Sequence, residues 1–202
     1  MKTIGDMPAT GRRIPGPGSN LIELEHDDVR HTAIVFDAIH RGHRSLNADL
    51  EVGMGFMTDP QVTGLVRLVK HAPDDGAFIY ATGTVYSIAE VVRELADVGE
   101  VGGVKAGLEL CYLVGEILVE AADQSVHSNL SGHGSIDPWR VLLKPDGQVA
   151  IVGYGLPRLE VELYIDDENR LPHEDSLRYC APENLRAGHE ADLSSDLFSL
   201  SL

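Results

Sequence analysis

The chain has 202 residues, which is enough for one sizeable domain or for two small lobes that share an interface. Its 32 acidic and 16 basic residues give a formal net charge of −16, so its field repels phosphate backbones and argues against a nucleic-acid partner. Hydrophobic residues make up 43% of the sequence, which predicts a packed core and argues against disorder.

Cysteine content and hydropathy predict a cytoplasmic protein without membrane insertion. Cys111 and Cys180 lie far apart and share no metal-type spacing, so we expect free thiols in a reducing compartment. The N-terminus lacks the apolar core of a signal peptide. The most apolar long stretch, residues 104–122, contains one lysine and three glutamates, which rules against a membrane span.

Residues 1–30 are predicted to form a Gly- and Pro-rich N-terminal arm or the first strands, with residues 1–20 as the most loop-like part. Residues 31–83 then alternate short apolar runs with turn signals, which predicts a small α+β region. We expect a turn at residues 73–76 and a helix over Arg44–Met57. The strands are expected at Leu21–Leu24, Thr32–Phe36, Thr63–Val69 and Ala77–Ala81.

Helices dominate the prediction for residues 84–202. Ser87 and Glu90 have the spacing of a capping box at the start of a helix. Asp146-Gly147 lies between two apolar runs, residues 141–143 and 149–152, and predicts a β-hairpin. Residues 163–176 are acidic and irregular, and an apolar helix is expected over residues 193–202. A longer helix is expected over residues 104–122, with one face formed by Val104, Leu108, Cys111, Tyr112, Gly115 and Leu118.

Four short motifs follow one another in this second region. Residues 133–140 read His-Gly-Ser-Ile-Asp-Pro-Trp-Arg, and the predicted hairpin follows at once. Residues 153–155 then read Gly-Tyr-Gly, and Ala181-Pro182-Glu183 and Asp196 come later. In order and spacing they resemble the H-R-D-L-x-x-x-N, D-F-G and A-P-E motifs of protein kinases and the aspartate that braces the kinase catalytic loop from a buried helix. The resemblance covers residues 31–202 and is firmest from residue 104 onward.

The resemblance implies an α+β, two-lobed protein kinase-like fold. Residues 31–83 would form a reduced N-lobe, in which Thr32–Phe36 resembles the strand with the kinase lysine and Leu50-Glu51 the helix with its glutamate partner. Residues 84–202 would form a helical C-lobe that is truncated near the buried helix, so we expect a fragment of a longer protein or a neighbouring element over the exposed apolar face. Structural roles are implied for His133, Ala181, Pro182, Glu183 and Asp196.

The chemistry of phosphoryl transfer is missing from the positions that the resemblance assigns to it. A kinase needs a lysine on the phosphates, a base for the hydroxyl proton, and an asparagine and an aspartate on the metal. In that order, these four positions hold Ile34, Ser135, Arg140 and Gly153. An aliphatic side chain holds no phosphate, serine is no base near neutral pH, a cation repels Mg²⁺, and glycine offers no side-chain oxygen. We therefore expect no catalytic residue, no metal site and no cofactor.

Other functional interpretations of the sequence find less support. Pro17 removes one backbone N–H from residues 16–19, the only candidate for a glycine-rich phosphate loop. Asp137 is more simply a loop carboxylate that caps backbone N–H groups than a displaced base. His127, His133 and Asp137 have no recognised metal-ligand spacing.

The sequence thus predicts a catalytically inactive domain that binds protein partners, as a scaffold or regulatory module in signalling. Its contact surface is expected in residues 156–180 or on the final helix, where self-association is also expected. The alternative is a sensor that binds a nucleotide without metal in a cleft near Ala33, Tyr80 and Leu142. An enzyme with rewired chemistry is a third hypothesis, which a cluster of convergent polar groups in the cleft would support.

Overall fold

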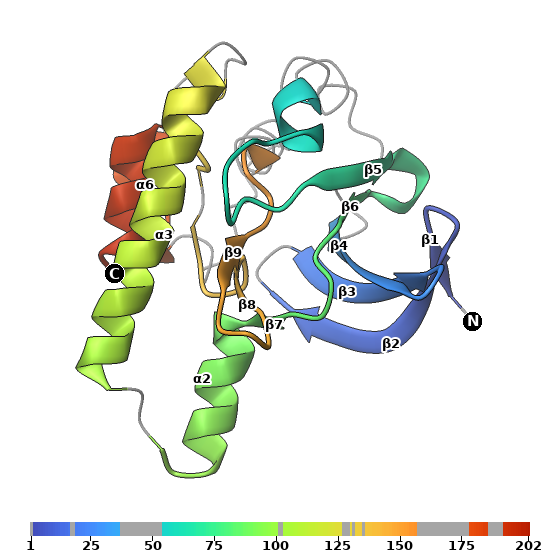
Figure 1. Cartoon of the computed structure of the whole chain (residues 1–202), viewed down its shortest axis with the longest axis horizontal. Helices are drawn as coiled ribbons and strands as arrows, with labels where there is room; N and C mark the ends of the chain where they lie inside the picture. The colour runs from blue at the N-terminus through green and yellow to red at the C-terminus, as the bar shows by residue number, and fades with distance from the viewer. Residues whose placement is uncertain are drawn as a thin grey trace.

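The computed structural model describes residues 2–16, 19–36, 54–100, 103–126, 130, 132–134, 136–156, 178–185 and 192–202. A curled six-stranded sheet lies on one side of the molecule, and helices α3 (Val104–Ser125) and α6 (Leu193–Leu200) lie on the other (Figure 1). A three-stranded sheet lies between them, and α2 (Ile88–Asp97) follows its first strand. The molecule therefore has a β-rich part and a helical part that meet at the small sheet.

The large sheet has the order β1-β2-β3-β4-β6-β5, and all its neighbouring strands are antiparallel. Asp27 and Asp28 join β3 to β4, and both have positive φ, 50° and 60°. A two-residue turn of this kind matches the twist of a hairpin, and aspartate tolerates it better than bulky residues do. The strands are β1 Thr3–Ile4, β2 Met7–Pro15, β3 Ser19–His26, β4 Val29–Phe36, β5 Leu68–Ala72 and β6 Ala77–Tyr80.

The prediction of an irregular segment over residues 1–20 is wrong for Met7–Pro15, which forms β2. The register of β2 against β3 shifts between Ala9 and Arg13, and Gly11 lies within that shift with φ +97°. Glycine suits such a bulge, because it reaches positive φ without a Cβ clash. The glycine and proline signals therefore mark an irregularity within the strand and its end. The strands predicted at Leu21–Leu24 and Thr32–Phe36 are confirmed.

The segment that precedes β5 links the two sheets. Residues 54–58 are helical, whereas the rest of the predicted helix, with Leu50 and Glu51, lies outside the described residues. The strand predicted over Thr63–Val69 is displaced, because β5 begins only at Leu68. Val66 N instead donates to Ile151 O over 2.9 Å, and Ile151 N donates to Gly64 O over 2.8 Å. The predicted turn at residues 73–76 is confirmed as a 3-10 turn closed by a left-handed glycine.

The small sheet and its helices follow the predicted local signals. Its strands β7 (Tyr86–Ser87), β8 (Val141–Leu143) and β9 (Val149–Ile151) lie in that order, which confirms the hairpin. The capping box of α2 is confirmed, since Glu90 N donates to Ser87 Oγ and Ser87 N donates to Glu90 Oε2. The final helix is confirmed as α6, whose N-cap is Asp192.

Helix α3 buries a different face from the predicted one. Of the six residues expected to share an apolar face, only Leu118 is buried, and three are 64% to 81% exposed: Val104, Leu108 and Tyr112. The helix has apolar side chains on several sides, so periodicity alone does not select the buried one. The buried hydrophobic residues are Val114, Ile117, Leu118 and Ala121. Within the part of the chain that the structure describes, no helix is long and apolar enough to span a membrane.

Candidate functional site

Three of the four positions that the resemblance assigns to phosphoryl transfer meet where the two sheets join. Ile34 is a fully buried residue of β4, and Arg140 and Gly153 flank the β8–β9 hairpin. A Cβ added to Gly153 would lie 3.0 Å from Ile34 Cδ1 and 3.8 Å from Arg140 Cδ. The fourth position, Ser135, lies outside the described residues. We call the place where Ile34, Arg140 and Gly153 meet the junction.

Arg140 is a buried cation at the junction, with 3% of its surface exposed. Its Nε lies 3.9 Å from Asp137 Oδ2. Trp139 N and Arg140 N both donate to Asp137 Oδ1, over 2.8 and 2.9 Å, so the prediction that Asp137 caps loop N–H groups is confirmed. Burial raises the pKa of Asp137, against the opposing effects of the Arg140 charge and these two hydrogen bonds.

Tyr80, at the end of β6, also belongs to the apolar core at the junction. Its hydroxyl is buried and has no hydrogen-bond partner among the described residues. Burial raises the pKa of Tyr80, and the positive charge of Arg140 opposes that rise. The phenol therefore stays neutral at neutral pH and adds no anionic oxygen to the junction.

Asp196 holds the backbone of residues 133–134 from α6. Its carboxylate oxygens accept hydrogen bonds from His133 N over 2.6 Å and from Gly134 N over 2.7 Å. A Cβ added to Gly132 would lie 2.8 Å from Asp196 Oδ2 and 2.8 Å from the backbone carbon of Asp192, so this close approach requires glycine. Burial raises the pKa of Asp196 to about 7 despite the two N–H donors.

His133 is a neutral side chain of the core. Burial, helped by the Arg140 charge, lowers the pKa of His133 to about 3. Nε2 lies 3.1 Å from Val152 O, and because a carbonyl only accepts, this nitrogen donates the proton. The ring packs edge to face on Tyr154 at 5.9 Å, and Tyr154 shares a 3.2 Å hydrogen bond with Ser125 Oγ. These contacts position the backbone of the loop.

The Ala181-Pro182-Glu183 segment lies beside the same loop. Ala181 is fully buried, and Pro182–Leu185 forms a 3-10 turn in which Glu183 is partly exposed. Asn184 Nδ2 donates to Gly134 O over 3.5 Å, so both this turn and α6 hold residue 134. Sequence reasoning missed Asn184, because an asparagine after Ala-Pro-Glu has no spacing signal of its own.

The turn between β2 and β3 lies against Trp139. Gly16 N donates to Ser19 O over 3.0 Å, and a Cβ added to Gly16 would lie only 3.2 Å from Trp139 Cδ1. Trp139 also packs on the ring of Tyr179, with centroids 6.4 Å apart and planes nearly perpendicular. Pro17 is outside the described residues. The indole thus connects the β2–β3 turn to the segment that precedes Ala181.

Apolar side chains of the two sheets share one buried cluster at the junction. Ile14 and Leu21 of the large sheet belong to one buried cluster with Leu142 and Val152 of the hairpin region. Each of these four residues is at most 8% exposed. At these four residues the facing sides of the two sheets are therefore buried.

Of the three residues expected near a nucleotide cleft, two share one buried cluster and the third lies in another. Tyr80 and Leu142 lie in the cluster at the junction. Ala33 belongs instead to the cluster on the opposite face of the large sheet. Successive side chains of a strand point to opposite faces, so the neighbour Ile34 takes the inner position.

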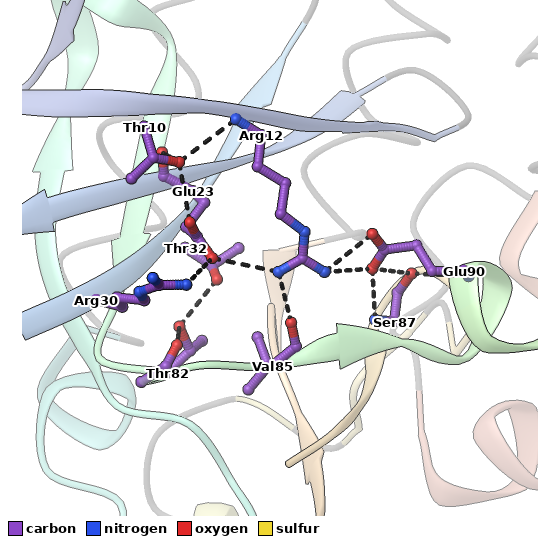
Figure 2. Close-up of polar contacts among 10 residues, drawn as sticks. Thr10, Arg12, Glu23, Arg30, Thr32, Thr82, Val85, Ser87 and Glu90 are labelled. Carbon is purple, nitrogen blue, oxygen red and sulfur yellow. Dashed lines mark hydrogen bonds and ion pairs between the residues drawn. The ribbon is translucent and has the colours of Figure 1, made fainter. Parts of the chain in front are cut away.

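Arg12 of β2 connects the large sheet to the second region of the chain (Figure 2). Its Nη2 donates to both carboxylate oxygens of Glu90 over 2.9 Å, and its Nη1 donates to Val85 O over 2.8 Å and to Glu23 Oε2 over 3.2 Å. Its guanidinium also lies 5.0 Å from the ring centre of Tyr86. We call this group the Arg12 clamp. Sequence reasoning found Glu90 through its capping box but missed Arg12.

Comparison with known proteins supports the fold and leaves the sequence family open. No protein-family model matches the sequence, and no curated protein matches it. The kinase domain of Mycobacterium tuberculosis PknI matches with a TM-score of 0.66 at 16% identity, over 100% of this chain and 73% of that domain. The kinase domain of maize SIRK1 bound to AMP-PNP matches with a TM-score of 0.65 at 15% identity, over 98% of this chain and 67% of that one. The chain therefore has the two-lobed α+β fold of protein kinases.

Proposed function

We propose that this chain is a catalytically inactive kinase-like domain that acts through protein contacts, as a scaffold or regulatory module in signalling. The contact among Ile34, Arg140 and Gly153 supports this most strongly. The resemblance assigns these positions to the phosphate-binding lysine, the metal-binding asparagine and the metal-binding aspartate. Phosphoryl transfer depends on charge placed around the phosphates and the metal, and an aliphatic chain, a cation and a glycine supply none of it.

The electrostatics of the junction favour the same conclusion. Removing even one hydrogen-bond donor that stabilises transition-state charge typically lowers kcat by about two to three orders of magnitude. Mg²⁺ prefers oxygen ligands, and the Arg140 cation repels it. Asp137, the carboxylate beside Arg140, already accepts hydrogen bonds from two backbone N–H groups.

Packing at the junction also weighs against nucleotide binding. Ile14 and Leu21 lie in one buried cluster with Leu142, and the Gly16 turn lies on Trp139. A nucleotide between the sheets would have to separate these contacts and strain the Arg12 clamp. Retaining this fold with apolar packing between its two parts, and without charged groups for phosphate and metal, fits a domain whose surface is the functional part.

Thermal unfolding with and without ATP, each with and without Mg²⁺, tests the proposal. A ligand at a hundred times its Kd stabilises a fold by about 2.7 kcal/mol, which shifts Tm by roughly 5–10 °C for a domain of this size. We expect no shift at millimolar nucleotide, whereas an active kinase domain measured alongside should shift. The Arg12→Met variant is a matched control: it releases the clamp, and we still expect no shift because the junction lacks ligands for phosphate and metal.

The outcomes separate the hypotheses. A shift that requires Mg²⁺, or phosphate transfer to a generic substrate protein, would overturn the inactive assignment. A shift with ATP alone would favour the metal-independent sensor. If neither the parent chain nor Arg12→Met shows a shift while the active kinase domain does, the proposal of a domain that works through protein contacts stands.

A further inference from the structure

An open groove runs along the outer side of α3. Its walls come from α3 between Cys111 and Asp123, from Leu197 and Leu200 of α6, and from the β8–β9 turn. It has a volume of about 1150 Å³. Three of its apolar residues are well exposed: Leu113 by 36%, Val119 by 53% and Leu197 by 46%. We call it the α3 groove.

The charge of the α3 groove has one sign. Glu116, Glu120 and Asp123 line it from α3, and Asp146 lines it from the β8–β9 turn. Among the lining residues that the structure describes, none is a lysine or an arginine. All four carboxylates belong to exposed residues, in a chain with a net charge of −16. This lining mixes exposed apolar side chains with acidic ones, which complements a ligand that carries both apolar and basic side chains.

We propose that the α3 groove binds a basic amphipathic helix of a partner protein. Such a helix would pack apolar side chains at i, i+3 or i+4, and i+7 against exposed apolar residues of the lining such as Val119 and Leu197. Its lysines or arginines would lie against Glu116 and Glu120. The inference rests on the proposed function and names the chemistry of its partner.

The dimensions of the groove favour a helix over other ligands. From Cys111 to Asp123, α3 is about 18 Å long, which corresponds to about three turns of a docked helix. Ligand pockets are concave sites that bury most of a small ligand, whereas this groove exposes apolar side chains along about three turns of α3. An extended peptide would need a free strand edge, but Ile151 of β9 already bonds to Gly64 and Val66.

Charge argues against a second copy of this chain as the occupant. A two-fold interface places the same patch against itself. Glu116, Glu120, Asp123 and Asp146 would then face the same four carboxylates, which repel at close range. A basic partner removes this repulsion, and its binding is expected to weaken as salt screens the charges.

Fluorescence anisotropy with a designed peptide tests the inference on the full chain. The probe is a labelled peptide of about eighteen residues with leucines along one helical face and lysines elsewhere. A second peptide has the same composition, with the leucines scattered so that the apolar face is lost. We expect the first peptide to bind in a saturable, salt-dependent way, and the second to bind at least about tenfold more weakly.

Paired variants locate the site. Glu116→Lys together with Glu120→Lys should weaken binding by about tenfold or more, whereas the same charge change at Glu94 and Asp97 on α2 should leave it nearly unchanged. Val119→Ser should weaken it, and Val92→Ser on α2, at a similarly exposed valine, should not. All these side chains are exposed, so each variant should keep the Tm of the parent chain.

Each contrary result has a distinct meaning. Equal binding of both peptides, or no effect of the Glu116 and Glu120 variant, would overturn the groove as a helix site. Concentration-dependent self-association in sedimentation, abolished by Val119→Ser, would make a second copy the occupant instead. If the peptides fail while ATP and Mg²⁺ also produce no thermal shift, the groove assignment fails alone. A Mg²⁺-dependent shift with intact peptide binding would refute the inactive assignment and leave the groove in place.

Discussion

Removing the Arg12 clamp should destabilise the fold measurably. Arg12 donates four hydrogen bonds, two to Glu90, one to Glu23 and one to Val85 O. Hydrogen bonds to charged groups contribute about 1.5–3 kcal/mol each, but exposed ion pairs contribute only about 0.2–1 kcal/mol. The Arg12 side chain is 28% exposed, so its contribution lies between these limits. In Arg12→Met, the Glu23 carboxylate still accepts a hydrogen bond from Arg30, and the Glu90 carboxylate still accepts from Ser87 N and Oγ. The main loss is therefore the hydrogen-bond donor to Val85 O.

We therefore expect Arg12→Met to lower the free energy of unfolding by about 2 kcal/mol. Urea denaturation of Arg12→Met, Glu90→Gln and the double variant forms a cycle that removes the capping contribution of Glu90. The coupling energy should be about 1 kcal/mol, with an unchanged denaturant slope. Glu94→Gln, on the exposed side of the same helix, is the matched control and should show no coupling to Arg12.

A coupling energy below about 0.3 kcal/mol would refute this reasoning, because the effects of mutations at independent sites also deviate from additivity by about that amount. The two regions would then be held together by their other contacts, such as the apolar cluster that contains Ile14, Leu21 and Leu142 and the hydrogen bonds of Ile151 with Gly64 and Val66. A changed denaturant slope would instead indicate that the clamp alters how much surface unfolding exposes.

Three further predictions concern the loop at residues 132–134 and the junction. The pKa of Asp196 is raised to about 7 in the folded state, so between about pH 4 and 6.5 the folded state keeps a proton that the unfolded state releases, and this group makes the free energy of unfolding fall as pH rises. The pKa of His133 is lowered to about 3, so over the same range the unfolded state holds the extra proton, and this group makes the free energy of unfolding rise with pH. Asp196→Asn should therefore make stability rise more steeply with pH than in the parent chain, and parallel urea-derived curves would contradict this. Gly153→Asp should destabilise by about 1–3 kcal/mol without creating Mg²⁺-dependent ATP binding, since Gly153 has φ +87° and Ile34 lies 3.0 Å from its Cβ position; a new thermal shift with Mg²⁺ and ATP would show that the junction can hold the metal. Gly132→Ala should destabilise by about 2–4 kcal/mol, whereas Gly107→Ala, in open space on α3, should stabilise by about 0.5 kcal/mol; equal effects in urea denaturation would refute the close approach to Asp192.

Local signals in the sequence were sufficient for several elements. The capping box of Ser87 and Glu90 and the Asp146-Gly147 turn require only neighbours within a few residues, so their structures could be read directly. The strand over Met7–Pro15 was missed because its pairing with β3 overrides the glycine signal at Gly11. In these cases the outcome depended on whether the stabilising contact was local.

The candidate site was only partly accessible to sequence reasoning. Motif order indicated that Ile34, Arg140 and Gly153 belong together, and the fold places them in contact. The inner position of Ile34 and the outer position of Ala33 depend on strand register, which a one-residue shift would reverse. Trp139 gave no signal, since its contact with Gly16 joins segments far apart in the chain.

The sequence by itself determined the excess of 32 acidic over 16 basic residues, and the aliphatic side chain, cation and glycine at positions that the resemblance assigns to phosphate and metal binding. Those properties depend on residue identity and spacing along the chain. Only the tertiary structure decided which side of α3 is buried and which forms an acidic, apolar groove. It also brought Arg12 to Glu90, 78 residues away, because contacts between distant segments depend on how the elements pack.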